Sequence, residues 1–148
     1  MGRVSASLQL AYPVETVFAV ATRIPDLPRW LPEVVAADLL DPDLMVGSRV
    51  RLRMGSATGN AEVVGTVKQY RPPNILAIGG SAGPLSIDVR TRLEGVSASV
   101  TRIVLEIEVV APPLLGFVAR EAERRINAEL AGSLERLRGL IEAETATV

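Results

Sequence analysis

Residues 87–109 read IDVRTRLEGVSASVTRIVLEIEV, and this stretch decides the class of fold. Apolar and polar side chains alternate along both of its halves, and a period of two is typical of strands that are buried on one face. One face would carry the odd-numbered side chains Ile87, Val89, Thr91, Leu93, Ile103, Leu105, Ile107 and Val109. The sequence therefore predicts two consecutive antiparallel strands, each with a dry face and a wet face.

Charged side chains on the wet face predict how these two strands align. When the numbers of facing residues sum to 196, Glu94 faces Arg102 and Arg90 faces Glu106. A slip of the pairing to a sum of 194 would instead set like charges opposite one another. Opposite charges across a strand pair contribute about 0.2–1 kcal/mol each, so the first register is favoured.

Segments on both sides of this pair are assigned from periodicity and from turn residues. Strands are predicted over 4–10, 34–40, 49–54, 61–70 and 75–78, with a turn over 55–60. Short helices are predicted after Pro13 and after Pro25, because proline suits the first turn of a helix. A long helix is predicted after Pro112 and Pro113, where apolar residues recur every three or four positions: Leu115, Val118, Ala122, Ile126, Leu130, Leu134, Leu137 and Ile141.

This order of elements predicts one α+β domain over residues 1–148, a curved seven-stranded antiparallel sheet with two short helices and a long C-terminal helix. About thirty residues of helix span ~45 Å, so the helix must cross the sheet diagonally. A sheet curved around one helix leaves space between the two layers, and we expect an apolar cavity there. Across it, the side chains of Ile103, Leu105 and Ile107 are expected to face Ile126 and Leu130.

The composition excludes several classes of function. The 148 residues include no histidine and no cysteine, which removes zinc sites, Ser-His-Asp arrangements and thiol chemistry, so no metal and no cofactor is expected. A formal net charge of −1 provides no basic surface for nucleic acid. The chain lacks the ~20 consecutive apolar residues of a membrane span and the apolar core of a signal peptide, which predicts a cytoplasmic location.

Several short motifs occur in a fixed order over nearly the whole chain. They are 12–18 after the first strand, 26–32, 46–49 before the arginine-rich strand, 70–76, 101–103, and 134–138 in the last helix. With these motifs the chain resembles the START-like superfamily, also called Bet v 1-like or SRPBCC, and within it the polyketide cyclase/dehydrase-like branch. The resemblance implies a helix-grip fold with a deep pocket. It also implies ligands such as lipids, sterols, hormones or polyketides, and some members are aromatase/cyclases.

The expected cavity walls are apolar side chains of the strands: Leu52, Met54, Val67, Leu76, Ile78, Val89 and Leu105. Trp30, which the resemblance places near the pocket mouth, is interpreted as a core anchor for the short helices or as part of the cavity wall that guards the opening, and the two roles can coexist. Phe117 begins the long helix, where it either faces the opening or packs against the core. Because aromatic residues make up only 3% of the chain, aliphatic walls are expected, which favours a flexible aliphatic ligand over a planar aromatic one.

Few polar side chains are candidates for the site, and none is assigned a catalytic role. Glu121 lies at the edge of the apolar stripe, where it reaches either a ligand or Arg125 on the helix surface. The Tyr70 hydroxyl either lies near the rim or supports the adjacent turn. Glu106 and Glu108 are expected to point away from the cavity, and the alternating arginines Arg49, Arg51 and Arg53 predict a solvated outer face with Glu62 as a partner.

Three functions stay open at this point. The first is binding or carriage of a lipid-like or polyketide-like molecule by a monomer or homodimer. The second is a polyketide cyclase or dehydratase, which requires polar groups that converge on one point of the cavity. The third is a regulatory module that contacts another protein, which requires a collapsed groove and an exposed apolar patch.

Overall fold

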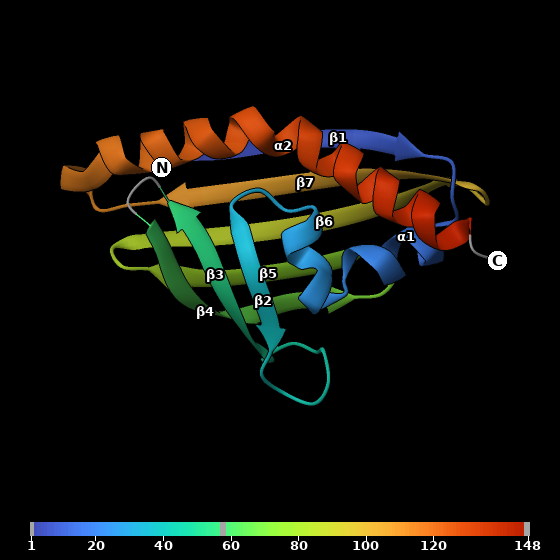
Figure 1. Cartoon of the computed structure of the whole chain (residues 1–148), viewed down its shortest axis with the longest axis horizontal. Helices are drawn as coiled ribbons and strands as arrows, with labels where there is room; N and C mark the ends of the chain where they lie inside the picture. The colour runs from blue at the N-terminus through green and yellow to red at the C-terminus, as the bar shows by residue number, and fades with distance from the viewer. Residues whose placement is uncertain (1, 57–58, 147–148) are drawn as a thin grey trace.

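In the computed structural model the chain folds as a curled antiparallel sheet with one long helix across it (Figure 1). The structure describes residues 2–56 and 59–146. Sheet neighbours run in the order β1-β7-β6-β5-β4-β3-β2, so the predicted seven-stranded α+β fold is confirmed. The strands are β1 (Gly2–Leu10), β2 (Val34–Leu39), β3 (Arg49–Ser56), β4 (Gly59–Arg71), β5 (Ile75–Ala82), β6 (Leu85–Ser97) and β7 (Val100–Val110). The helices are α1 (Val14–Ala21), η1 (Ile24–Arg29), η2 (Pro113–Leu115) and α2 (Gly116–Thr145).

The β6–β7 pair has the register that the charges predicted. Glu94 lies opposite Arg102, and Arg90 lies opposite Glu106. Alternate residues of β7 are buried, and Ile103, Leu105 and Ile107 belong to the same core cluster as Ile126 and Leu130 of α2. The predicted packing of the dry face against the long helix is therefore confirmed.

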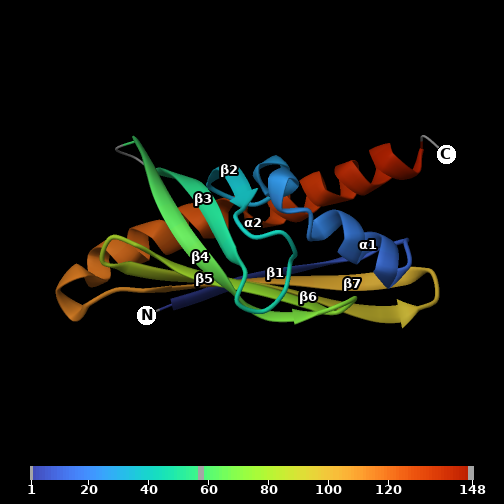
Figure 2. The same ribbon diagram turned by 90° about the horizontal axis from the view of Figure 1, so that it is seen from below.

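The long helix packs mainly along β1 and also contacts α1 and β7, and it lies at an angle to the strands (Figures 1 and 2). Its largest fully buried side chains are those of Leu130, Leu134, Leu137 and Ile141. Near its start Ala119 is buried, whereas the predicted stripe residues Val118 and Ala122 are only half-buried. The predicted apolar stripe is thus buried from Ile126 to Ile141, and Ala122 packs against the core. In the first turn Ala119 is buried in place of the predicted Val118.

Two elements differ from the sequence prediction, one at prolines and one at glycines. The second short helix is a 3₁₀-helix that contains Pro25 and Pro28, and a proline inside a helix cannot donate the backbone bond that an α-helix needs. Strand β5 continues beyond its predicted end at Ile78, through Gly79 and Gly80 to Ala82. Of the turn predicted over 55–60, residues 57–58 lie outside the described residues.

The extension of β5 depends on a glycine pair. Gly80 lies opposite Gly65 of β4, and a Cβ atom on Gly80 would approach the Gly65 Cα to 3.0 Å. A Cβ on Gly65 would likewise lie 3.2 Å from the carbonyl oxygen of Gly79. A side chain at either position would therefore crowd the neighbouring strand, and both glycines line the cavity on the inner face of the sheet.

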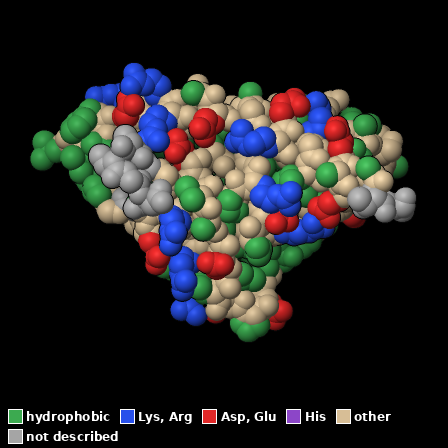
Figure 3. All heavy atoms as spheres, in the orientation of Figure 1, with side chains coloured by type: hydrophobic (Ala, Val, Ile, Leu, Met, Phe, Trp, Pro, Cys, Tyr) green, Lys and Arg blue, Asp and Glu red, His purple; other side chains and the backbone are tan. Residues whose placement is uncertain are grey.

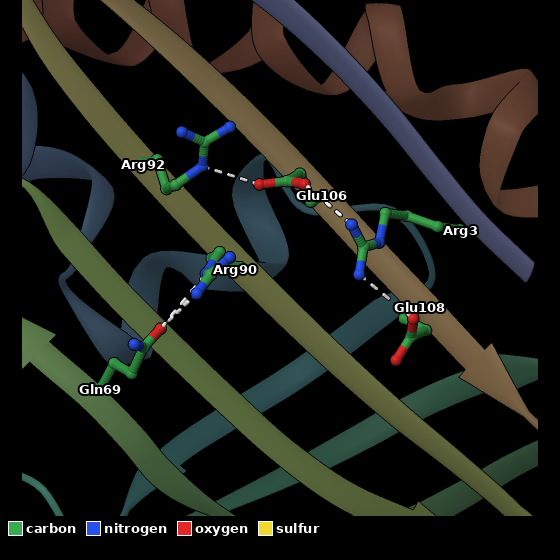
Figure 4. Close-up of polar contacts among 6 residues, drawn as sticks. All are labelled: Arg3, Gln69, Arg90, Arg92, Glu106 and Glu108. Carbon is green, nitrogen blue, oxygen red and sulfur yellow. Dashed lines mark hydrogen bonds and ion pairs between the residues drawn. The ribbon is translucent and has the colours of Figure 1, made fainter.

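The outer face of the sheet is covered by charged side chains that pair diagonally (Figure 4). Glu106 accepts a hydrogen bond from Arg92 Nε at 2.7 Å, although Arg90 is the residue directly opposite it. Arg90 instead donates from Nε and Nη2 to Gln69 Oε1, at 3.2 and 3.0 Å. Arg3 joins this layer through Glu108 at 3.4 Å. Glu106 and Glu108 therefore point away from the core, as expected.

The arginine strand β3 also presents its charges outward. Arg49 Nη2 lies 3.1 Å from Asp41 Oδ1, and Arg51 Nε lies 4.0 Å from Glu62 Oε1. Between them Val50 is buried, so one face of β3 is wet and the other is dry.

Two leucines of the chain offer a matched test of the core. Leu130→Ala should lower the free energy of unfolding by about 2–5 kcal/mol, since it opens a cavity at a buried contact between α2 and the sheet. Leu114→Ala, at a side chain that is 90% exposed, should change it by no more than about 0.5 kcal/mol. Urea titration followed by Trp30 fluorescence measures both, and equal losses would contradict the packing.

The outward arginines should tolerate substitution. Arg51→Gln removes an exposed charge with a partner 4.0 Å away, and such pairs contribute about 0–1 kcal/mol. We expect a change in unfolding free energy of no more than about 0.5 kcal/mol in the same titration. A loss of several kcal/mol would mean that this face of β3 is buried against something.

Candidate functional site

An apolar cavity of about 50 Å³ lies between the inner face of the sheet and the helical segments that cover it. Its walls come from α1, η1 and the link to β2, from β2 to β7, and from α2. The lining residues are Ala21, Leu27, Leu31, Pro32, Val34, Leu52, Met54, Val63, Gly65, Leu76, Ile78, Gly80, Ile87, Val89, Thr91, Ile107 and Ile126. The sequence pattern predicted a cavity in this region, between the curved sheet and the long helix.

Five side chains that were expected in the walls line this cavity: Leu52, Met54, Leu76, Ile78 and Val89. Val67 and Leu105 are fully buried on the same face of the sheet but lie outside the cavity lining. Inward orientation thus followed from the period of two, whereas the sequence pattern does not determine which inward side chains border empty space.

Four other candidate residues lie away from the cavity lining. Trp30 has 0% exposure and packs in the core, so the anchor interpretation describes its position and the guard interpretation does not. Phe117 is 63% exposed, so it does not pack in the core, and it lies outside the cavity lining. Tyr70 is half-buried, with its ring centroid 6.0 Å from that of Phe18. Glu121 is exposed and bonds Arg124, one turn of helix away.

Sequence reasoning missed the side chains that cover the cavity opposite the sheet. These are Ala21 at the end of α1, Leu27 in η1, Leu31 and Pro32 in the link to β2, and Val34 at the start of β2. The motif at 26–32 marked this segment, but its irregular backbone has no period from which side-chain directions follow. The inward positions Ile87 and Thr91 could have been added from the alternation of β6 alone.

The cavity offers almost no polar chemistry. Among its described lining residues, Thr91 alone has a polar side chain, and none is ionisable. The described residues contain no cluster of three or more acidic, histidine or cysteine side chains that could hold a metal. The indole N–H of Trp30 is buried without a hydrogen-bond partner among the described residues. General acid–base chemistry therefore lacks a donor or acceptor of protons in this lining.

The shifted pKa values belong to surface ion pairs and not to the cavity. Hydrogen bonds from the Arg49 side chain and backbone hold the pKa of the Asp41 carboxyl below its usual value. The Arg49 pKa rises correspondingly, and the pKa of Arg23 is raised by its hydrogen bond to Glu144. Asp41 contributes stability above its unfolded pKa that is lost as the pH falls through its lowered folded pKa.

An ion pair lies beside the lining where α2 meets the start of β2. Arg125 Nη2 donates to Glu33 Oε2 at 3.2 Å, and the two side chains are 34% and 16% exposed. Glu33 lies between the lining residues Pro32 and Val34, and Arg125 precedes the lining residue Ile126. We call Glu33 and Arg125 the rim pair. Sequence reasoning had placed Arg125 with Glu121, because partners distant in sequence leave no local signal.

The visible face carries mixed charges and exposed apolar side chains in several places (Figure 3). Basic and acidic side chains are interspersed on the visible face, which gives no single-sign field. Hydrophobic side chains gather at the end where α2 begins. Leu114 and Phe117, next to and within the first turn of α2, are 90% and 63% exposed. No helix of the described chain is both long enough and apolar enough to cross a membrane.

A comparison with models of known protein families identifies the family of this chain. Residues 1–142 match the family model described as polyketide cyclase / dehydrase and lipid transport. The chain belongs to this family. No curated protein matches its sequence. The cyclase/dehydrase and lipid transport family is a branch of the START-like, Bet v 1-like superfamily, so the resemblance and the helix-grip fold are both confirmed.

Solved structures share the fold of this family member at low sequence identity. The Zhui aromatase/cyclase from Streptomyces sp. R1128 superposes with a TM-score of 0.78 at 18% identity, over 97% of this chain and 95% of that one. TTHA0849 from Thermus thermophilus gives 0.77 at 16% identity, over 97% and 99%. A START superfamily protein from Mycobacterium smegmatis gives 0.68 at 15%, over 95% and 97%. At these identities the likeness shows the fold alone.

Thr91 offers a test of the apolar lining. Thr91→Val replaces its hydroxyl with a methyl group of similar size, so unfolding free energy should stay within about 1 kcal/mol or rise. Urea titration of both proteins measures the change. A loss greater than about 1.5 kcal/mol would show that the hydroxyl has a buried hydrogen-bond partner.

Proposed function

We propose that this chain binds a hydrophobic small molecule in the space between the curled sheet, η1 and α2. The observation that supports the proposal is the lining itself, which is apolar on every side except at the Thr91 hydroxyl. An apolar surface gains about 25 cal/mol per Å² when a ligand removes it from water. The whole chain would then act as one ligand-binding domain. Its monomeric or homodimeric state and its cytoplasmic location stay predictions from the sequence.

The size of the cavity requires that the protein adapts to its ligand. The enclosed volume is about 50 Å³, whereas sites for drug-sized ligands measure about 300–1,000 Å³. A lipid-like molecule therefore enters only if part of the wall moves. The segment from η1 to β2 is the candidate for this movement. Two arginines of α2 hold it by side-chain hydrogen bonds: Arg125 bonds Glu33, and Arg136 Nη2 donates to the Trp30 carbonyl at 3.2 Å. The segment would move when these bonds break.

The lining favours binding over cyclisation. A cyclase needs polar groups placed to orient the substrate and to move protons, and no ionisable side chain lines the described cavity. The family relationship and the shared fold of an aromatase/cyclase keep polyketides within the range of possible ligands. The exposed Leu114 and Phe117 are the feature that an interaction module would use, and binding assays separate the two ideas.

Two valines on opposite faces of the sheet test the proposal. Val89 lines the cavity, and Val64 is exposed on the outer face of β4. Val89→Asp should weaken binding of the neutral fluorescent probe N-phenyl-1-naphthylamine by tenfold or more, because an unpaired carboxylate beside the ligand is costly to bury. Val64→Asp should leave the affinity unchanged.

Circular dichroism and Trp30 fluorescence must first show that both variants are folded. If Val89→Asp does not fold, Val89→Thr serves instead, with a smaller loss of affinity expected. Equal affinities in all folded variants would place the probe outside the cavity. Failure of the folded wild-type protein to bind the probe, together with fatty acids and sterols, would contradict the proposed function.

A further inference from the structure

We infer that the ligand is an amphiphile with a carboxylate head, and that Arg125 binds this head in place of Glu33. The inference rests on the proposed function and names the class of ligand. An apolar chain would occupy the cavity, while the charged head stays at Arg125, next in the chain to the lining residue Ile126 and bonded to Glu33, which follows the lining residue Pro32. The polar group that reaches a ligand from α2 would thus be Arg125 and not Glu121.

The rim pair is the charged contact at the edge of an otherwise apolar site. Both of its residues are sequence neighbours of lining residues, and both side chains are more buried than those of the neighbouring ion pair on α2, Glu121 with Arg124. A partly buried charge interacts more strongly than one in bulk water. A ligand head at this position would therefore gain more than at the exposed surface.

Arg125 has unused capacity for such a head. Among the described residues its guanidinium bonds Glu33 alone, through one nitrogen. A guanidinium carries five N–H donors in a planar fork, and this fork matches the two oxygens of a carboxylate. A ligand carboxylate at the rim would offer the same oxygens as Glu33 and would bring an apolar chain into the cavity.

The backbone at Glu33 adopts a conformation that is unfavourable for a residue with a side chain. Glu33 has φ of 63°, in the left-handed region that disfavours residues with a Cβ atom, and it is the described non-glycine residue with positive φ. Its carbonyl accepts a hydrogen bond from the Gly55 N–H at 2.7 Å, which fixes the segment to the end of β3. Such outliers concentrate at ligand sites and switch regions.

The test compares decanoic acid with decan-1-ol, which share a chain length and differ in the head. Displacement of N-phenyl-1-naphthylamine at neutral pH gives both affinities for wild type and variants. Arg125→Gln should weaken decanoate by roughly 10- to 100-fold, the loss of a charge-assisted hydrogen bond, and should leave decan-1-ol unchanged. Glu33→Gln should strengthen decanoate and leave the alcohol unchanged, because it removes the competing carboxylate.

Arg124→Gln is the matched control, since Arg124 adjoins Arg125 but bonds the exposed Glu121. It should change neither affinity. If Arg125→Gln does not fold, Arg125→Lys replaces it and should retain a preference for decanoate over the alcohol.

Three results would overturn the inference. Equal losses of acid and alcohol in Arg125→Gln would make Arg125 a structural support. Equal gains of both in Glu33→Gln would make the rim pair a latch without head selectivity. If the folded wild type binds neither amphiphile nor the probe, the proposed function itself fails, and this outcome differs from the first two because no affinity exists to compare.

Discussion

The pairing of β6 with β7 is the constraint on which the rest of the structure depends. Because strand side chains alternate between faces, a slip of one residue would move every apolar side chain of a strand to the wet face. The observed register keeps Leu93, Ile103 and Leu105 buried and leaves Arg92 and Glu106 outside. The apolar inner face of the sheet that results must be covered by another element, and α2 lies across it. The cavity is the part of this face that α2 does not fill.

The shape of the cavity follows from three local features. The glycine pair Gly65 and Gly80 lets β4 and β5 approach closely where the sheet curls. The 3₁₀-helix η1 places Leu27 over the inner face, and the Leu31–Val34 link closes one side. The helix α2 contributes Ile126 there and holds the link through polar contacts of Arg125 and Arg136. A largely apolar space with a charged rim suits a molecule that is apolar along most of its length.

Much of the fold could be predicted from the sequence because its signals are local. Alternation identified the strands, and charge complementarity selected the right β6–β7 register, although Glu106 then pairs diagonally with Arg92. The extension of β5 through Gly79 was missed, since glycine normally interrupts a strand. The segment that covers the cavity, from η1 to the start of β2, could not be predicted, because its irregular backbone has no period. The rim pair could not be predicted either, because Glu33 and Arg125 are far apart in sequence and Glu33 adopts an unusual backbone angle. Trp30 was placed by family resemblance and Phe117 by its position at the start of the long helix. The exposure of both depends on tertiary packing that no local pattern encodes.

The central claim is that an apolar molecule occupies the space between the sheet and α2. The most direct measurement is a set of intermolecular nuclear Overhauser effects between decan-1-ol and the methyl groups of the folded protein. Occupation of the cavity predicts contacts to Met54, Ile78 and Ile126, with none to the exposed methyl groups of Leu114. Contacts confined to Leu114 and its neighbours, or no contacts at a saturating concentration of the alcohol, would contradict it.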